Sequence, residues 1–283
     1  MLILSVPFLL YEVSFIYIHS NIILEKRQVR GIIHPGKRVY KMNKVAIITG
    51  SSKGLGAATA KYFAKNNYNV VINYTSNLEK AKEVEEKIKK EYQVETLLVQ
   101  ADVSKEEDVL KLLNETKNKF GRIDVLVNNA GIAIDTTLED KTVENFKKIL
   151  DVNLIGVFLC CKHIGTFMKE QGFGSIVNIS STNGIDSFYP YSMDYDASKA
   201  GVISLTHNFA QEFAPTIKVN TIAPGWINTE MNKELDEDYI KEECKHILLD
   251  RFAEPEEIAE TIYFTATSSY LNDSIIKVDG GRC

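Results

Sequence analysis

The chain has 283 residues, of which 45% are hydrophobic and 25% charged, and its formal net charge at pH 7 is -5. This composition is globular, and it excludes a disordered, collagen-like or disulfide-dense protein. The sequence contains no repeat, low-complexity tract or basic stripe, and none of its four cysteines lies in a C-x-x-C motif. We therefore expect no nucleic-acid partner, no metal site, reduced thiols and a cytoplasmic protein.

Residues 1–41 differ in composition from the rest of the chain. Residues 2–24 are strongly apolar but are interrupted by Pro7, Glu12 and other polar positions, and a basic stretch follows at residues 26–41. One explanation is a signal anchor, because about 20 apolar residues span a bilayer. A second is a cleaved secretion signal, although no small-residue cleavage site is visible. We favour a third, translation from a start codon placed too early, because a spanning helix rarely tolerates such polar groups. We expect no membrane attachment unless residues 2–24 are a real anchor.

A strand and a glycine-rich turn begin the second part of the chain, in the segment KVAIITGSSKGLG from Lys44 to Gly56. The apolar, mostly β-branched run Val45–Ile48 is typical of a strand buried on both faces of a parallel sheet. Glycines at 50, 54 and 56 allow the turn, close approach to a pyrophosphate and close packing of the next helix. The segment predicts a dinucleotide site at a helix N-terminus. The glycine spacing is G-x-x-x-G-x-G, so an ordinary tight turn is the alternative.

Further strands and amphipathic helices alternate along the chain. We expect strands at residues 69–74, 94–99, 123–127, 175–179, 217–221 and 274–278, and helices at residues 55–65, 78–92 and 105–120. This alternation predicts an α/β fold, a Rossmann-type doubly wound parallel sheet of about seven strands in a single domain. Ligands of such a sheet lie outside the carboxyl ends of its strands.

A tyrosine precedes a lysine by four residues in the segment YDASK, from Tyr195 to Lys199. This spacing places both side chains on one face of a helix. Tyrosine has an unperturbed pKa of about 10, so a nearby cation is needed to stabilise its phenolate at neutral pH. The pair is therefore a candidate proton donor and its electrostatic partner.

With these motifs in place, the chain resembles the short-chain dehydrogenases/reductases. The resemblance spans residues 42–281, so we expect a catalytic domain at residues 42–283. It is carried by TGSSKGLG at 49–56, Asp102-Val103, NNAG at 128–131, Asn153, NISS at 178–181, YDASK, and PGWINT at 224–229. The segments RFAEPEEIA at 251–259 and IIKVDGG at 275–281 look most like those of bacterial 3-oxoacyl-acyl-carrier-protein reductases.

The resemblance implies four catalytic residues, Asn153, Ser181, Tyr195 and Lys199. Ser181 is selected over its neighbour Ser180 by alignment on Gly184. The interval from Ser181 to Tyr195 is one residue longer than in the carrier-protein reductases, which we interpret as an insertion within residues 185–194. Its side chains either line an apolar substrate pocket or pack on the subunit itself; they are Phe188, Tyr189, Pro190, Tyr191 and Met193.

The resemblance also implies a set of cofactor contacts. These residues are Gly50, Ser52, Lys53, Gly54, Leu55, Gly56, Thr75, Asp102, Val103, Asn129, Ala130, Gly131, Tyr195, Lys199, Ile227 and Thr229. The second strand ends without the carboxylate that would favour NAD, and Lys53 adds a cation beside it. We therefore expect NADP(H) as the cofactor.

The resemblance favours NADPH-dependent reduction of 3-oxoacyl thioesters on acyl carrier protein, in fatty-acid synthesis. The segments 169–171 and 213–216 contain only one basic residue for an acidic carrier. A reductase or dehydrogenase of a free alcohol, sugar or ketone is therefore the alternative, and a non-catalytic NADP-sensing protein is a third reading. We expect a homotetramer. We also expect residues 228–250, beside Trp226, to form a lid. The acidic run 234–243 of this lid is interpreted as a solvated helical face.

Overall fold

One parallel sheet organises the computed structural model, which describes residues 43–232 and 235–282. Its strands are β1 (Lys44–Ile48), β2 (Tyr68–Tyr74), β3 (Thr96–Gln100), β4 (Val125–Asn128), β5 (Gly174–Ile179), β6 (Ile217–Pro224) and β7 (Ile275–Val278). They lie in the order β3-β2-β1-β4-β5-β6-β7, and every neighbouring pair is parallel. The predicted doubly wound sheet is confirmed. The predicted N-terminal extension, residues 1–41, lies outside the described residues.

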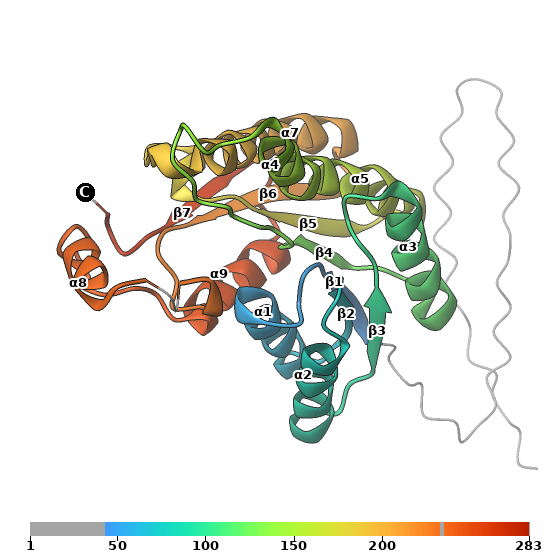
Figure 1. The fold of residues 1–283 in the computed structure, drawn as a ribbon. Coiled ribbons are helices and arrows are strands. Elements are labelled where there is room, and N and C mark those ends of the chain that lie inside the picture. Colours follow the sequence, from blue (N-terminus) through green and yellow to red (C-terminus); the bar gives the residue numbers. More distant parts are fainter. Residues whose placement is uncertain (1–42, 233–234, 283) are drawn as a thin grey trace, which may run out of the picture. The chain divides into compact units, whose positions relative to one another are not determined.

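Helices cover both faces of this sheet (Figure 1). Side chains of α1 (Gly54–Lys65), α2 (Leu78–Glu91) and α9 (Pro255–Thr267) share one buried cluster with the strands. The cluster on the other face includes side chains of α3 (Glu106–Phe120) and α7 (Met193–Phe213). Strand residues such as Ile47 and Ile48 are fully buried because alternate side chains enter opposite clusters.

A long helical stretch packs on the same face of the sheet as α3 and α7. It consists of α4 (Val143–Leu150), α5 (Gly156–Cys160) and α6 (Thr166–Gln171), linked by the π-helical turns η1 (Asp151–Ile155) and η2 (Cys161–Gly165). By length and composition alone this stretch could cross a membrane, but half of its most apolar window is buried. Burial of one side against the sheet is the pattern of a core helix in a folded domain.

Two strands, β3 and β4, begin two residues later than the sequence predicts, and side chains bond the backbone next to both starts. Asn69 Oδ1 accepts the Glu95 N–H at 2.9 Å, and β3 begins at the next residue. The Asp124 carboxylate accepts the Val45 N–H at 2.9 Å and also binds Arg122, and β4 begins at the next residue. Such contacts do not alter the hydrophobic pattern from which the strands were predicted.

The predicted insertion at residues 185–194 is shorter as a loop than expected. It contains the turn η4 (Pro190–Ser192), after the turn η3 (Thr182–Gly184), and α7 already begins at Met193. Asp194 therefore belongs to the first turn of α7, where its Oδ1 accepts the Tyr195 N–H at 3.0 Å. An acidic side chain in that turn stabilises the helix start.

Candidate active site

The turn between β1 and α1 has the shape of a phosphate cradle. Gly50 and Gly54 have φ angles of +62° and +54°, a conformation that suits glycine. A Cβ on Gly56 would lie 2.5 Å from Asn129 Nδ2, 2.9 Å from Ser51 Cα and even closer to the Gly50 carbonyl. The turn can close this tightly only without side chains, and it leaves the N-terminal N–H groups of α1 free to face an anion.

Polar side chains outside the glycine motif hold this turn in place. Asn73 Oδ1, on β2, accepts the Gly50 N–H at 3.0 Å, and its Nδ2 binds the Ala101 carbonyl at 2.9 Å. Thr49 Oγ1 accepts the N–H groups of Asn129 and Ala130 at 2.9 and 3.0 Å. The Asn129 side chain donates back to the Thr49 carbonyl at 2.9 Å. Asn129 therefore supports the turn, and sequence reasoning missed Thr49 and Asn73 because their partners lie on other strands.

The remaining predicted cofactor residues surround the same end of the sheet. Lys53 and Thr75 are exposed, at the start of α1 and the end of β2, while Ser52 and Leu55 are half-buried. Thr229 faces Gly54 from the loop after β6, since a Cβ on Gly54 would lie 3.7 Å from its side chain. The backbone of Ile227, in the same loop, bridges to Ala253.

Asp102 and Val103 follow β3 with different environments. The Asp102 carboxylate accepts hydrogen bonds from the Ser104 N–H and hydroxyl at 3.1 and 2.7 Å. Val103 is buried and packs where a Cβ on Gly156 would lie, so its side chain belongs to the core. Only its backbone is available to a cofactor.

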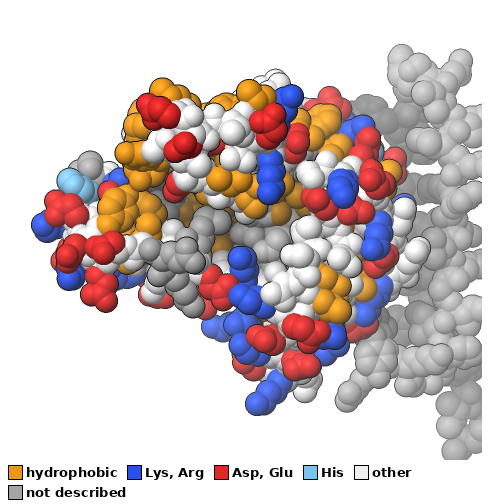
Figure 2. Space-filling model, in the orientation of Figure 1, with side chains coloured by type: hydrophobic (Ala, Val, Ile, Leu, Met, Phe, Trp, Pro, Cys, Tyr) orange, Lys and Arg blue, Asp and Glu red, His pale blue; other side chains and the backbone are white. Residues whose placement is uncertain are grey.

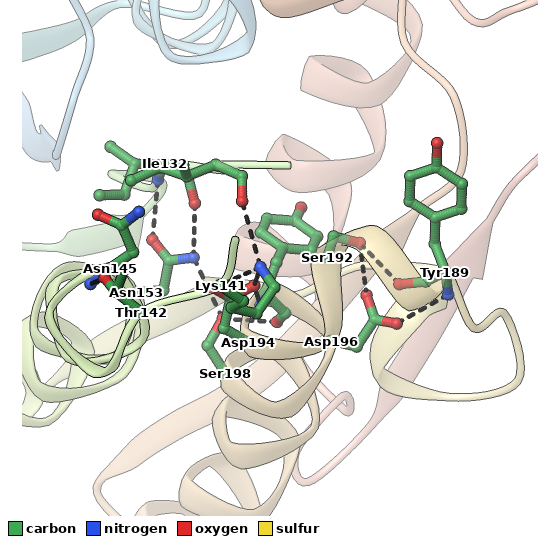
Figure 3. A network of polar contacts seen from close by, with 12 residues as sticks. Ile132, Lys141, Thr142, Asn145, Asn153, Tyr189, Ser192, Asp194, Asp196 and Ser198 are labelled. Carbon is green, nitrogen blue, oxygen red and sulfur yellow. Dashed lines mark hydrogen bonds and ion pairs between the residues drawn. The ribbon is translucent and has the colours of Figure 1, made fainter. Parts of the chain in front are cut away.

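The predicted catalytic residues converge where β4, β5 and α7 meet. A Cβ on Gly131 would lie 3.4 Å from Asn153 Oδ1 and 3.6 Å from Lys199 Nζ. The fully buried Asn153 holds the backbone of Ile132 through two hydrogen bonds, of 2.8 and 2.9 Å, and donates to Ser198 Oγ at 3.1 Å (Figure 3). The structure thus brings Gly131, a predicted cofactor residue, against two predicted catalytic groups.

The two neighbouring serines have different partners. The Ser180 hydroxyl donates to the Lys199 carbonyl at 2.8 Å and is buried there. The Ser181 hydroxyl contacts Asn183 Oδ1 at 3.3 Å, accepts the Asn183 N–H at 3.2 Å and also bonds Tyr195. Ser181 is therefore the serine that shares a site with Tyr195.

Burial governs the charges of Tyr195 and Lys199. It raises the pKa of Tyr195 to about 12, against the opposing hydrogen bond from Ser181, with Asp196 and Asp135 raising it further. Burial lowers the pKa of Lys199 to about 8. Lys199 Nζ donates to the Ile179 carbonyl at 2.8 Å and lies 5.4 Å from the centre of the Tyr195 ring. The structure thus differs from the expectation of a lowered tyrosine pKa, because burial outweighs the hydrogen bond from Ser181.

These two pKa values predict a pH profile. Tyr195 remains protonated throughout the neutral range, whereas Lys199 loses its charge as pH rises through about 8. We expect kcat/KM for carbonyl reduction to be constant below pH 8 and to fall above it, because neutral Lys199 cannot stabilise a developing phenolate. Steady-state rates between pH 6 and 10 measure this profile. A rate that stays constant to pH 10 would contradict it.

Two hollows flank these groups on the side of the residue 185–194 segment. Phe188, Tyr189, Pro190 and Met193 line a cavity of about 420 Å³ together with Asp196 and other α7 residues. Tyr189 and Tyr191 line a second one, of about 440 Å³, with Asp135, Thr136, Thr137 and Asp140. Figure 2 shows hydrophobic side chains above a central hollow on the α7 side and Lys and Arg side chains below it. The five side chains of this segment named above thus line hollows on this side of the molecule, and Phe188 is 79% exposed.

The end of the predicted lid, residues 228–250, is attached by backbone hydrogen bonds, which the Leu248 and Leu249 N–H groups donate to the Gly281 and Gly280 carbonyls at 3.2 Å. Its helix α8 (Glu237–Lys245) buries no residue, but Glu243 Oε2 accepts hydrogen bonds from Trp226 Nε1 and Arg282, both at 2.8 Å. Trp226 also stacks on Phe252, with ring centres 5.2 Å apart. Asp236, Glu237, Asp238 and Glu242 of the acidic run are exposed as predicted, whereas Glu243 has these inward partners; Glu234 lies outside the described residues. No group of three or more His, Cys, Asp or Glu side chains suited to a metal occurs among residues 43–232 and 235–282.

Known proteins share this architecture and its sequence. The family model described as short chain dehydrogenase matches residues 44–240. The chain is 39% identical over 243 residues to the 3-oxoacyl-[acyl-carrier-protein] reductase FabG of Staphylococcus epidermidis, covering 85% of this chain and 99% of that protein. The structure of levodione reductase has a TM-score of 0.78 and 36% identity, covering 84% of this chain and 96% of that one. The structure of ElxO with NADP bound also has a TM-score of 0.78 and 36% identity, covering 85% of this chain and 98% of that one.

Proposed function

This chain belongs to the short chain dehydrogenase family, and on that basis we propose that it reduces a carbonyl group with NADPH. The leading substrate is a 3-oxoacyl thioester on acyl carrier protein, as the name of the Staphylococcus relative suggests. The observation that carries the proposal is the shared site of Ser181 and Tyr195, with Lys199 Nζ beside the tyrosine ring. A non-catalytic NADP-sensing protein would not need these groups together.

The proposed mechanism assigns a role to each of these side chains. When held at the turn between β1 and α1, NADPH would supply a hydride to the carbonyl carbon. Tyr195, which is protonated at neutral pH, donates its hydroxyl proton to the carbonyl oxygen. Ser181 donates a hydrogen bond that orients this oxygen, and the Lys199 ammonium stabilises the resulting phenolate. Asn153 fixes the backbone at Ile132, beside the cofactor site.

The preference for NADPH is proposed from charge at the end of β2. The segment after Asn73 has no carboxylate before Glu79, and exposed Lys53 lies at the start of α1. We expect Lys53→Glu to raise KM for NADPH about tenfold, which corresponds to about 1.4 kcal/mol, and to leave KM for NADH nearly unchanged. Lys65→Glu, at the far end of the same helix, is the matched control. Equal changes for both cofactors would place Lys53 away from the 2'-phosphate.

One observation favours the alternative of a free carbonyl substrate. Lys169 is the basic residue in the segments that would receive an acidic carrier, and its Nζ is bound to the Glu212 carbonyl at 2.8 Å and carboxylate at 3.1 Å. A lysine neutralised in this way attracts an acidic partner weakly. The deciding experiment compares NADPH oxidation with acetoacetyl groups on acyl carrier protein, on a small thiol, and with free sugars and ketones. Preference for the carrier supports the leading substrate, and turnover of free carbonyls alone supports the alternative.

We further propose a cytoplasmic homotetramer. Exposed apolar side chains suited to subunit contacts occur on the helix that holds Asn153 and near the C-terminus; they are Ile155, Phe158, Phe264 and Tyr270. Light scattering measures the assembly, and a monomer at micromolar concentration would contradict it.

A further inference from the structure

We propose that Lys141 and Asp194 form a buried ion pair that positions Tyr195 for proton transfer. This inference rests on the proposed carbonyl reduction, because it concerns the proton donor of that reaction. Neither residue belongs to the predicted catalytic or cofactor set. Both are positioning residues, since they act through the backbone around Tyr195.

The pair is fully enclosed and well aligned. Lys141 Nζ lies 3.0 and 2.9 Å from the two carboxylate oxygens of Asp194. The Lys141 side chain is 4% exposed and that of Asp194 0%. The ammonium also contacts the Ile134 carbonyl at 3.4 Å, so all three of its N–H groups have acceptors (Figure 3).

Asp194 connects this cation directly to the proton donor. Its Oδ1 accepts the backbone N–H of Tyr195 at 3.0 Å, in the first turn of α7. N–H groups in the first turn of a helix lack partners within the helix, so this bond fixes the residue that carries the phenol. The position of the phenol then depends on where the ion pair holds Asp194.

Lys141 is the last residue of a loop, residues 132–141, and both ends of this loop are hydrogen-bonded to residues near the catalytic groups. At its start, Ile132 makes two backbone hydrogen bonds to the Asn153 side chain. In its middle, the Thr136 N–H donates to the Tyr191 carbonyl at 3.1 Å. At its end, Lys141 reaches Asp194. The loop therefore joins the cofactor side of the site to the turn that carries Tyr195.

Stability alone does not explain a buried pair at this place. Removing two charges from water is costly, and apolar residues of similar volume usually stabilise a protein at least as well. What apolar side chains cannot supply is direction, because only the carboxylate binds both the ammonium and the Tyr195 N–H. We therefore infer that the pair fixes the position of Tyr195 and is not retained for stability.

The test separates positioning from stability. The double variant Lys141→Met/Asp194→Leu removes both charges together, so we expect its melting temperature to stay within a few degrees of wild type. We expect kcat for an acetoacetyl thioester to fall about tenfold or more, with KM and NADPH affinity within about threefold, because a misplaced proton donor slows only the chemical step. The control Lys82→Met/Glu79→Leu removes an exposed pair on α2 and is expected to keep wild-type kcat.

A second readout does not depend on activity. Hydrogen exchange of peptides covering residues 132–142 and 193–199 is expected to speed up in the double variant and not in the control. A stable double variant with wild-type kcat, or with unchanged exchange, would overturn the inference. A wild-type protein that reduces no carbonyl would refute the proposed function instead, and the exchange result would then still decide whether the pair fastens the loop.

Discussion

Replacing Tyr195 with phenylalanine is expected to lower kcat for carbonyl reduction about 10³-fold, within the range that general acid catalysis contributes. The variant removes one hydroxyl and keeps the ring that lies over Lys199 Nζ. Ser181 cannot substitute as the acid, because its proton is needed to orient the carbonyl oxygen and serine is a much weaker acid. Binding of NADPH is expected to remain within about threefold of wild type, since the loss falls on the transition state alone.

Stopped-flow measurement of NADPH oxidation, alongside NADPH titration by fluorescence, checks both parts of this result. Tyr92→Phe is the matched control, since it removes the same atom from a half-buried tyrosine at the end of α2. Activity of Tyr195→Phe close to that of the control would refute the enzymatic proposal.

Adding a methyl group at Gly56 is expected to abolish cofactor binding. The Cβ of alanine would lie 2.5 Å from Asn129 Nδ2 and 2.9 Å from Ser51 Cα, and the Gly50 carbonyl is nearer still. Backbone atoms cannot rotate away as a flexible side chain would, so the turn must open. We expect NADPH affinity to fall at least about 100-fold, or about 2.7 kcal/mol, because the cradle depends on this closure. Overpacking is expected to cost a further loss of stability of about 1–3 kcal/mol.

Calorimetric titration with NADPH and thermal unfolding measure these two effects separately. Gly121→Ala is the control, because Gly121 has a φ of +69° but open space around its Cβ, far from the turn. It is expected to lose about 1–2 kcal/mol of stability to backbone strain and to bind NADPH normally. If Gly56→Ala bound NADPH as tightly as Gly121→Ala, the β1–α1 turn would not be the cofactor cradle.

The features that could be predicted are those encoded locally. An apolar run such as Val45–Ile48 predicts a strand buried on both faces, because the signal lies entirely within the run itself. The glycines of the turn and the spacing of Tyr195 and Lys199 are equally local. The alternation of strands with helices predicts a doubly wound parallel sheet, and the observed sheet agrees.

Contacts between distant residues could not be predicted in this way. Asn73 lies on β2 and Gly50 in the turn after β1, and Lys141 reaches Asp194 across 53 positions of sequence. Nothing in the hydrophobic period distinguishes Lys141 from a solvated lysine, because its burial arises only when the loop folds over α7. The pKa of Tyr195 was misjudged for the same reason, since spacing indicates proximity to Lys199 but not the burial of the tyrosine.

The contact of Glu243 with Trp226 and Arg282 affects where a purification tag can be attached. Arg282 donates to Glu243, which lies on a helix that buries none of its own residues, and it shares this carboxylate with Trp226. Arg282 therefore ties α8 to the segment that follows β7. A purification tag attached after Cys283 would begin two residues beyond Arg282, so such a tag is best removed before kinetic comparisons are made.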